Sequence, residues 1–499
     1  MVNSQTRHTP SAPSPWLLPV LLTVQFLVSL DMSVVNVALP GMGRGLHFGP
    51  GSLTWVVNAY ALTFGGLLMF GGRLADVVGR RRVLVAGFVV FGAASLAGGL
   101  AQSPGALIAA RAAQGVGAAA LAPVGLALLT VSCPPGPARS RALGLWGAAG
   151  AVGGAVGVLA GGLLTDWFGW RAVMLVNVPF VVAVLAVTGR AVPADTPAAD
   201  TPAADTPAAA RRAPRPRLDL TGALLVTAGT VLLVLGLVRT ETYGWASWRT
   251  AAVLGAAAVL LAAFVVTEAR TAAPLLRLGL LGTGPVLAAN VFGLLMSAGQ
   301  FAAFYFTSLY LQQVLGYGPT ATGSAFLPFC AGVVVGSALA ARAIGRYGPR
   351  VLLTAGGLLG AAGLAWFAAA AAVDGGFAGS VLGPSAVASV GIGLCFVPLG
   401  TAATGSVAAG EAGMASGLLN SSRQVGGAVG LAVLGTVAAH ASGAAPDAVA
   451  LVHGFSAAYW TAAGLLAAGA LAAAALYGRG GRAGQAPAAD AEPAQAAAG

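Results

Sequence analysis

The sequence predicts an all-α membrane protein that crosses the bilayer fourteen times, and three observations carry this prediction. Hydrophobic residues make up 57% of the 499-residue chain and charged residues only 8%, too few to cover the surface of a soluble protein of this size. The apolar stretches run for about twenty residues without strict alternation, which favours membrane helices over the strands of a barrel. Glycine, at 74 residues, is typical of membrane helices whose backbones approach closely.

The apolar runs can be followed in order along the chain. The first, 16–39, is too long for the core of a signal peptide and has no clear cleavage site, so we expect it to remain as the first span. The other runs have similar lengths. The fourteen expected spans cover residues 16–39, 53–72, 83–101, 106–131, 142–164, 172–189, 219–238, 250–267, 285–312, 321–343, 351–373, 380–402, 413–439 and 451–477.

The arginines indicate which side of the membrane the termini occupy. An even number of spans places both termini on one side. The terminal segments and the loops on that side hold 19 of the 25 basic residues, whereas the opposite loops hold only Arg44, Arg171, Arg239 and Arg249. Because cytoplasmic loops carry the excess of basic residues, we expect a multi-pass protein of the cell (cytoplasmic) membrane with both termini in the cytoplasm.

The spans group as six, two and six. The segment 72–81 follows the second span and is similar to 341–350, which follows the tenth, so that Gly79 matches Gly348. Duplicated halves are characteristic of secondary transporters. The expected organisation is a disordered cytoplasmic N-terminus at 1–15, a six-helix bundle at 16–190, a cytoplasmic linker rich in proline, alanine and arginine at 191–218, two inserted helices at 219–280, a second six-helix bundle at 281–478 and a disordered cytoplasmic tail at 479–499.

Missing residue types exclude or disfavour several classes of function. The chain contains no lysine, so it lacks the phosphate-binding lysine of a standard ATP-driven pump. Its four histidines show no metal-ligand spacing, and no metal site is expected. Its arginines form no stripe interleaved with aromatic residues, so nucleic-acid binding is not expected either. We therefore expect no cofactor and no enzymatic activity.

Two charged residues inside predicted spans are the candidates for chemistry. Asp31 lies in the first span and Arg111 in the fourth, where a charged group is costly and usually functional. Burial favours the protonated form of a carboxyl group and a nearby cation favours the carboxylate, so a group held between these effects can bind and release a proton. We expect Asp31 and Arg111 to couple proton movement to a transport step. Arg111 needs a partner, which is either Asp31 or backbone carbonyls, and a purely structural hydrogen-bonding role is its alternative. For Asp31 the alternative is a snorkelling or interfacial position, since Pro40 indicates that the helix end is near.

The loop after the second span is a candidate conformational latch. It contains Gly72, Asp76, Gly79 and Arg80, and Asp76 could cap a helix or pair with an arginine in one conformation of the protein. An anchor that fixes topology is the alternative role for the same residues. Neither role is catalytic.

Glycines of the fifth span form a stripe along one helical face. Gly150, Gly154, Gly157 and Gly161 recur at intervals of three or four residues, and Gly162 follows them. Such a stripe predicts a groove for close packing against another helix.

Scattered polar and aromatic residues are candidates for the wall of a substrate cavity. A site for amphipathic molecules needs apolar and aromatic walls with few polar groups. For each residue, helix packing or a place in the interfacial belt is the alternative. The candidates are Trp55, Tyr60, Gln114, Trp146, Asn290, Gln300, Tyr305, Tyr310, Arg423 and Gln424.

These segments resemble the fourteen-span drug:proton antiporter branch of the major facilitator superfamily, over nearly the whole chain. The segment 72–82 is similar to the signature loop between spans two and three, 150–162 to the antiporter motif of the fifth span, and 31–40 to the first-span motif of this branch. The fourth-span arginine motif is similar to the set Arg111, Gln114, Gly115 and Gly117. Other motifs of the branch are similar to Trp170-Arg171, Asn177-Val-Pro179, the pair Asp219 and Gly222, Tyr310-Leu-Gln and Gly316-Tyr-Gly-Pro319.

The sequence departs from the family pattern at two places. Val158 follows Gly157 where the fifth-span motif usually has proline, which weakens the case for a proline hinge. The predicted span 321–343 has no carboxylate, unlike some relatives that export polyvalent cations, so a dicationic substrate is not expected.

The resemblance implies a major-facilitator fold of two six-helix bundles with two extra central helices. It also implies a monomer that exports small amphipathic drugs or antibiotics in exchange for protons by alternating access, with the proton gradient as its energy source. Lipid, protons and the substrate would be its partners. The alternatives are proton-coupled uptake of a nutrient and a non-transporting membrane sensor. A sensor usually has a sizeable soluble domain, which this sequence lacks.

Overall fold

The computed structural model describes residues 15–49, 52–133, 137–192, 219–244, 246–271, 274–407, 411–443 and 447–480. Within these ranges the chain is helical and has no strand, as predicted. The segments expected to be disordered at 1–15 and 479–499, and the linker expected at 191–218, lie almost entirely outside the described residues.

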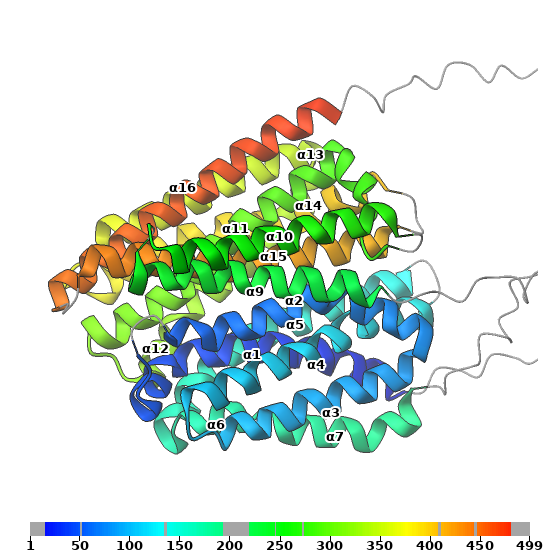
Figure 1. Cartoon of the computed structure of the whole chain (residues 1–499), viewed down its shortest axis with the longest axis horizontal. Coiled ribbons are helices and arrows are strands. Elements are labelled where there is room, and N and C mark those ends of the chain that lie inside the picture. The colour runs from blue at the N-terminus through cyan, green and yellow to red at the C-terminus, as the bar shows by residue number, and fades with distance from the viewer. Residues whose placement is uncertain are drawn as a thin grey trace, which may run out of the picture.

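The helices before the linker pack together as one group (Figure 1). The long central helix α1 lies along α5, α4 packs between α2 and α3, and α7 packs on α3. A short 3₁₀ turn, η1, precedes α2. The helices of this group are α1 (Leu17–Leu46), α2 (Trp55–Val78), α3 (Arg80–Gly99), α4 (Pro104–Ser132), α5 (Pro137–Phe168), α6 (Trp170–Leu175) and α7 (Asn177–Ala191).

The helices after 283 form a second group, in which α13 packs on α14 and α16, and α11 packs on α15 and α16. Two π-helical segments, η4 (Tyr310–Val314) and η5 (Phe377–Leu382), join α-helices of this group. Its α-helices are α11 (Gly284–Leu309), α12 (Pro319–Ala325), α13 (Leu327–Ala370), α14 (Gly383–Thr404), α15 (Ala412–Ser442) and α16 (Ala448–Gly480).

The two inserted helices, α9 (Leu220–Tyr243) and α10 (Trp248–Arg270), form a hairpin beside the boundary between the two groups (Figure 1). Helix α9 packs on α2 of the first group and on α15 of the second, and α10 packs on α9. The short turn η3 (Leu278–Gly282) leads from the hairpin toward α11.

The number of spans agrees with the predicted fourteen once one long helix is divided. Thirteen helical segments in the described residues are long and apolar enough to cross a membrane, and one of them, Pro319–Ala370, has 52 residues. Within it, Gly348 has a φ of 72° and breaks α13 into two helices just before Pro349. Gly79 has a φ of 109° between α2 and α3. The two glycines matched in the sequence repeat therefore each make a sharp turn between consecutive spans, in a conformation that L-residues with a side chain rarely adopt.

The first span extends further than predicted. Pro40 lies inside α1 rather than at its end, and the helix continues to Leu46, where His47 closes it with a φ of 53°. Thirty residues of α-helix measure about 45 Å, longer than the roughly 30 Å hydrocarbon core, so the last turns of α1 extend beyond it.

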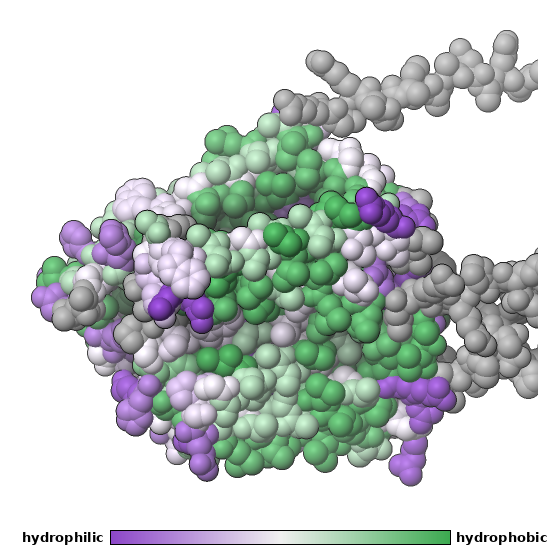
Figure 2. Space-filling model, in the orientation of Figure 1, coloured by the Kyte–Doolittle hydropathy of each residue, from purple (hydrophilic) through white to green (hydrophobic). Residues whose placement is uncertain are grey.

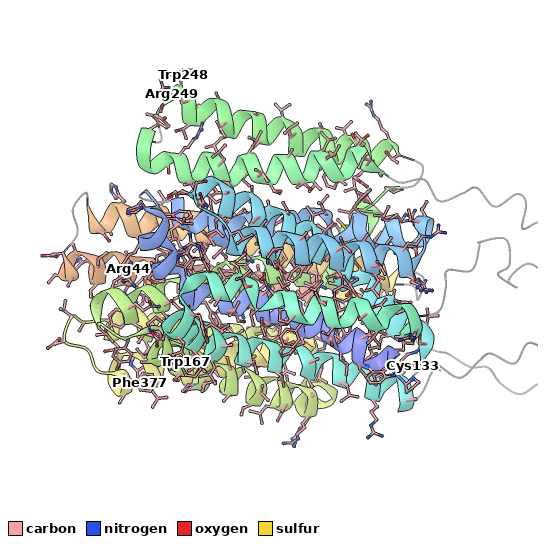
Figure 3. All side chains as sticks on the ribbon, turned by 90° about the horizontal axis from the view of Figure 1, so that it is seen from below. Arg44, Cys133, Trp167, Trp248, Arg249 and Phe377 are labelled. Carbon is pink, nitrogen blue, oxygen red and sulfur yellow. The ribbon has the colours of Figure 1, made fainter. Side chains whose placement is uncertain are left out.

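The surface agrees with a membrane-spanning protein. Figure 2 shows a broad apolar zone across the middle of this face, with hydrophilic residues concentrated toward its two ends. Trp167, Trp248, Arg44 and Arg249 lie at one end of the helices and Cys133 at the other (Figure 3). Trp167 and Trp248 are 69% and 75% exposed, as expected for tryptophans at the membrane interface.

Candidate functional site

Asp31 and Arg111, the two charged residues predicted inside spans, form a buried ion pair. Arg111 Nη1 donates to Asp31 Oδ2 at 2.6 Å. Asp31 is fully buried and Arg111 is 1% exposed. The two residues come from the middle of α1 and the first half of α4, so the pair lies inside the first helix group and away from its ends.

Arg111 makes further contacts besides the ion pair. Its Nε donates to the backbone carbonyl of Val56 at 2.9 Å, and its Nη1 also contacts Gln114 Oε1 at 2.9 Å. The guanidinium lies 4.5 Å from the centre of the Tyr60 ring. The two alternatives for its partner, a carboxylate and a backbone carbonyl, are therefore both realised in the same side chain.

Two amides complete the environment of the carboxylate. Gln114 Nε2 donates to Asp31 Oδ1 at 3.1 Å, and Asn177 Nδ2 donates to the same oxygen at 2.8 Å. Ser95 accepts a hydrogen bond from Gln114 Nε2 at 2.7 Å behind them. Asn177 and Ser95 were not among the predicted site residues. Asn177 begins α7, and its polar side chain inside an apolar run was the available signal.

The hydrogen bonds fit an ionised carboxylate. Asp31 receives three donors, from Arg111, Gln114 and Asn177. A protonated carboxyl group must donate, so these partners would have to rearrange if Asp31 bound a proton. Asn177 Oδ1 has no partner among the described residues, so rotation of this amide would present an acceptor. Protonation and local conformation are therefore linked by the chemistry of the partners.

A cavity of about 1530 Å³ lies between the two helix groups. It extends from Asn36 and Gln300, at mid-depth, to Asp76, Arg80 and Arg139 at the end of the molecule that carries the arginine-rich loops. Arg111 borders this cavity, whereas Asp31 is not part of its lining. The proton-binding candidate is thus separated from the cavity by its own arginine partner.

The opposite end of the molecule is closed by contacts between the two groups. The backbone N–H of Thr320 donates to Asp166 Oδ2 at 2.9 Å, which joins α12 to the end of α5. Ser308 Oγ donates to the carbonyl of Asn36 at 2.8 Å, and Gln312 Nε2 donates to that of Val37 at 2.9 Å. Among the described residues, the cavity therefore opens toward the end with the arginine-rich loops and is closed at the other.

The structure divides the residues predicted to line a cavity into two sets. Trp146, Gln300, Arg423 and Gln424 do line it. The other six lie outside its lining. Tyr60 and Gln114 belong to the Asp31 network, and Trp55 packs beside α9 and α15. Asn290 accepts a hydrogen bond from Ser422, Tyr305 packs against Phe306, and Tyr310 donates to the carbonyl of Ala372. In helices that are apolar on every face, hydropathy does not show which face meets the cavity, and this explains the misplaced residues.

The candidate latch lies at the open end of the cavity. Asp76 is near the end of α2, 3.8 Å from Arg80 of the next helix, and both side chains are at least one-third exposed. Gly72 packs against Pro123 of α4, and Gly79 makes the turn between the two helices. In this conformation Asp76 makes its ion pair within its own helix group and not with the other.

The glycines of the fifth span face neighbouring helices closely. Gly150, Gly157 and Gly161 lie against α1, and Gly162 lies against Pro319 and Thr320 of α12. Gly154 has more room, with Ser33 as its neighbour. Helix α5 is continuous from Pro137 to Phe168, without a break at Val158, where the family pattern has proline.

We expect Gly157→Ala to destabilise the protein by about 1–3 kcal/mol, as is typical of overpacking. A Cβ at Gly157 would lie 2.8 Å from the carbonyl oxygen of Leu30, so the helix backbones must move apart. Thermal unfolding of the purified protein in detergent measures this effect. Gly144→Ala on the same helix is the matched control because nothing lies within 4 Å of its Cβ position. Equal unfolding temperatures for both variants would contradict the close α1–α5 contact.

Comparisons of the sequence and of the fold with known proteins both find membrane transporters. The family model of the Major Facilitator Superfamily matches residues 21–431. The chain is 44% identical to the cephamycin export protein CmcT of Amycolatopsis lactamdurans over 436 residues, covering 87% of this chain and 86% of that one. It is 41% identical to the puromycin resistance protein pur8 of Streptomyces alboniger over 469 residues, covering 90% and 89%. Among solved structures, a peptide transporter POT in complex with sulfate shares the fold, with a TM-score of 0.66, 17% identity and coverage of 94% and 95%.

Proposed function

Because this chain belongs to the Major Facilitator Superfamily, we propose that it exports small amphipathic antibiotics or drugs across the cytoplasmic membrane in exchange for protons, by alternating access. Relatives named for cephamycin export and puromycin resistance, which align over most of this chain, support export over nutrient uptake. The proposed transporter is a monomer with no enzymatic activity and no cofactor.

The observation that carries the proposal is the Asp31–Arg111 pair behind a large cavity. A carboxylate held by three donors and removed from solvent is suited to binding a proton in only part of a transport cycle. The cavity has the volume for a drug-sized molecule, and its wall is mostly apolar with a few polar side chains. Proton and substrate sites that share Arg111 as a boundary can influence each other without direct contact.

The proposed cycle begins from the conformation described above. With the arginine-rich loops in the cytoplasm, the cavity is open to the cytoplasm, and the α5–α12 and α1–η4 contacts close the outside. The substrate enters from the cytoplasm while Asp31 is ionised. After the two groups rock to open the outer side, the substrate leaves and Asp31 takes up a proton. The return to the inward-open state releases that proton into the cytoplasm.

Inverted membrane vesicles provide the test. We expect vesicles containing the protein to accumulate a transported antibiotic only while a proton gradient is present, because export from the cell is uptake into an inverted vesicle. A panel including cephamycin- and puromycin-type compounds is the starting point. A protonophore added at steady state should release the accumulated compound. Accumulation that is unaffected by the protonophore would rule out proton exchange, and accumulation only in right-side-out vesicles would favour uptake.

A further inference from the structure

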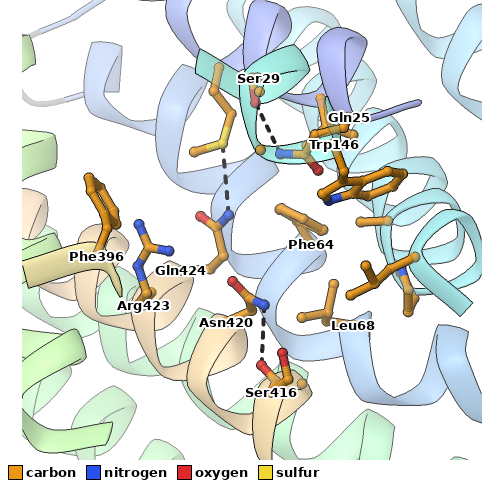
Figure 4. Close-up of a pocket in the computed structure, with 18 of the residues that line it drawn as sticks. Gln25, Ser29, Phe64, Leu68, Trp146, Phe396, Ser416, Asn420, Arg423 and Gln424 are labelled. Atoms are coloured by element: carbon orange, nitrogen blue, oxygen red, sulfur yellow. Dashed lines mark hydrogen bonds between the residues drawn. The ribbon is translucent and has the colours of Figure 1, made fainter. Parts of the chain in front are cut away.

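A second arginine, Arg423, faces the cavity from the other helix group. It lies on α15, near the middle of this 31-residue helix, and is one of the cavity-lining residues. Its aliphatic stem packs beside Gly293 of α11, and its guanidinium lies 5.0 Å from the centre of the Phe396 ring (Figure 4). The charge is therefore held in place at mid-depth in the membrane-spanning region.

Unlike Arg111, Arg423 has no anionic partner in the part of the chain that the structure describes. Among the described residues no carboxylate lies within ion-pair distance of it, and its buried Nε has no hydrogen-bond partner. Arg111, in contrast, contacts Asp31, Gln114 and the carbonyl of Val56. A permanent charge at this depth is costly and is usually paired or used by a ligand. The described residues supply the Phe396 ring but no anionic group for Arg423 to pair with.

The charges of the whole cavity wall favour an anion. The lining contains one carboxylate and five arginines: Asp76, Arg73, Arg80, Arg111, Arg139 and Arg423. Arg80 lies 3.8 Å from Asp76, and Arg111 is neutralised by Asp31. Arg73, whose Nε also has no partner among the described residues, and Arg139 lie toward the open end, which leaves Arg423 as the unpaired charge deep in the cavity. No carboxylate in the described lining offers a site for a cation at that depth.

The opposite wall is suited to an apolar molecular body. Figure 4 shows Arg423, Gln424 and Asn420 on α15, with Phe64, Leu68 and Trp146 of the first group across the cavity from them. Phe64 and Leu68 come from α2 and Trp146 from α5. Gln424 Oε1 has no partner among the described residues, so the amide beside Arg423 has an unused acceptor. At this depth α15 thus presents a cation and two amides, and Phe64, Leu68 and Trp146 form an apolar patch opposite them, with Gln25 and Ser29 beside that patch.

We propose that Arg423 binds the anionic group of the substrate, which makes the exported compound an amphipathic monoanion such as a carboxylate or sulfonate. Its apolar body would lie against Phe64, Leu68 and Trp146. This inference rests on the proposed export function and specifies its substrate class. It also agrees with the cavity-lining residues of α13, which include no carboxylate to recognise a cation.

Three probes with one fluorophore test the charge preference: dansyl-phenylalanine, an anion; its methyl ester, which is neutral; and dansylcadaverine, a cation. Binding is measured by fluorescence with the purified full-length protein in nanodiscs of zwitterionic lipid. We expect the acid to bind about tenfold or more tightly than the ester, since a hydrogen bond to a charged group contributes that much when desolvated. Arg423→Gln should remove this difference, and Arg423→Lys should retain part of it.

The control variant is Arg139→Gln, which removes an arginine at the open end whose Nε already donates to the carbonyl of Cys133, and it should change the preference by less than about threefold. An unchanged preference for the acid in Arg423→Gln would overturn the proposal. So would an equal loss of binding for all three probes, which would show that Arg423 only supports packing. If Arg423→Gln fails to fold, Arg423→Lys must still prefer the acid over the ester by a smaller factor than the wild type does.

Two further arms separate the possible outcomes. Adding phosphatidylglycerol to the nanodiscs tests whether a lipid headgroup is the anion, and loss of acid binding there would overturn the substrate assignment. Proton-driven accumulation of the acid in inverted vesicles tests the proposed function separately. Selective acid binding without accumulation would contradict antiport while supporting the anion site. Proton-driven accumulation of the acid without selective binding would support antiport and contradict the anion site.

Discussion

Replacing Asp31 with asparagine is expected to abolish proton-driven accumulation while leaving the protein folded. Asparagine has nearly the same shape and keeps an oxygen that can accept from Arg111 Nη1, but it cannot bind and release a proton. One proton moving across 100 mV provides about 2.3 kcal/mol, enough for about fifty-fold accumulation of a neutral compound, because each tenfold step costs about 1.4 kcal/mol. The accumulation ratio in Asp31→Asn vesicles should fall to about 1.

The measurement is antibiotic uptake into inverted vesicles, with the amount of folded protein determined by size-exclusion chromatography. Asp31→Glu is the control, since it keeps a titratable carboxyl group one methylene further from the backbone and should retain partial coupling. Substrate exchange without a proton gradient should persist in Asp31→Asn if the cavity is intact. Full proton-driven accumulation by this variant would remove Asp31 from the mechanism.

Truncating Arg111 is expected to have the largest effect on stability. Arg111→Leu leaves the carboxylate of Asp31 fully buried with only two amides to donate to it, and breaking a buried ion pair in this way typically costs about 3–5 kcal/mol. Arg111→Lys should be intermediate, because an ammonium cannot reproduce the planar fork that contacts both Asp31 and Val56. Thermal unfolding in detergent and the yield of folded protein measure both variants.

The double variant Asp31→Asn/Arg111→Gln separates charge from packing. Removing both members of a buried ion pair is often nearly neutral for stability, so this protein should be more stable than Arg111→Leu and yet inactive in proton-driven transport. A Leu variant as stable as the wild type would show that the pair does not hold α1 and α4 together.

The sequence was sufficient to predict those features that depend on the bilayer and on charge. A carboxylate and a guanidinium inside apolar spans demand partners, so Asp31 and Arg111 could be identified before their contact was known. Similarly, Gly79 and Gly348 could be matched in the repeated segments, and both have positive φ. The fold and the span count follow from such constraints.

Features that depend on helix rotation could not be predicted in the same way. Tyr305 and Tyr310 were expected to line the cavity, yet they pack within the second group, because hydropathy is uniform around these helices and gives no preferred face. Ser95 was missed for a related reason: a small hydroxyl within an apolar helix is common, and only the position of Gln114 shows that it belongs to the network. Span 16–39 ended too early because proline was read as a helix end.

The α9–α10 hairpin makes the two flanks of the transporter unequal. Where α2 and α15 meet, α9 covers the boundary with residues such as Val234, which packs against both groups. The other boundary, between α5 and α13, has no inserted helix, and Leu143 and Val334 there are both exposed at the surface and part of the cavity lining. A compound dissolved in the lipid therefore meets a covered flank on one side and an uncovered one on the other. The α5–α13 flank is the side on which a path from the bilayer to the cavity meets no inserted helix.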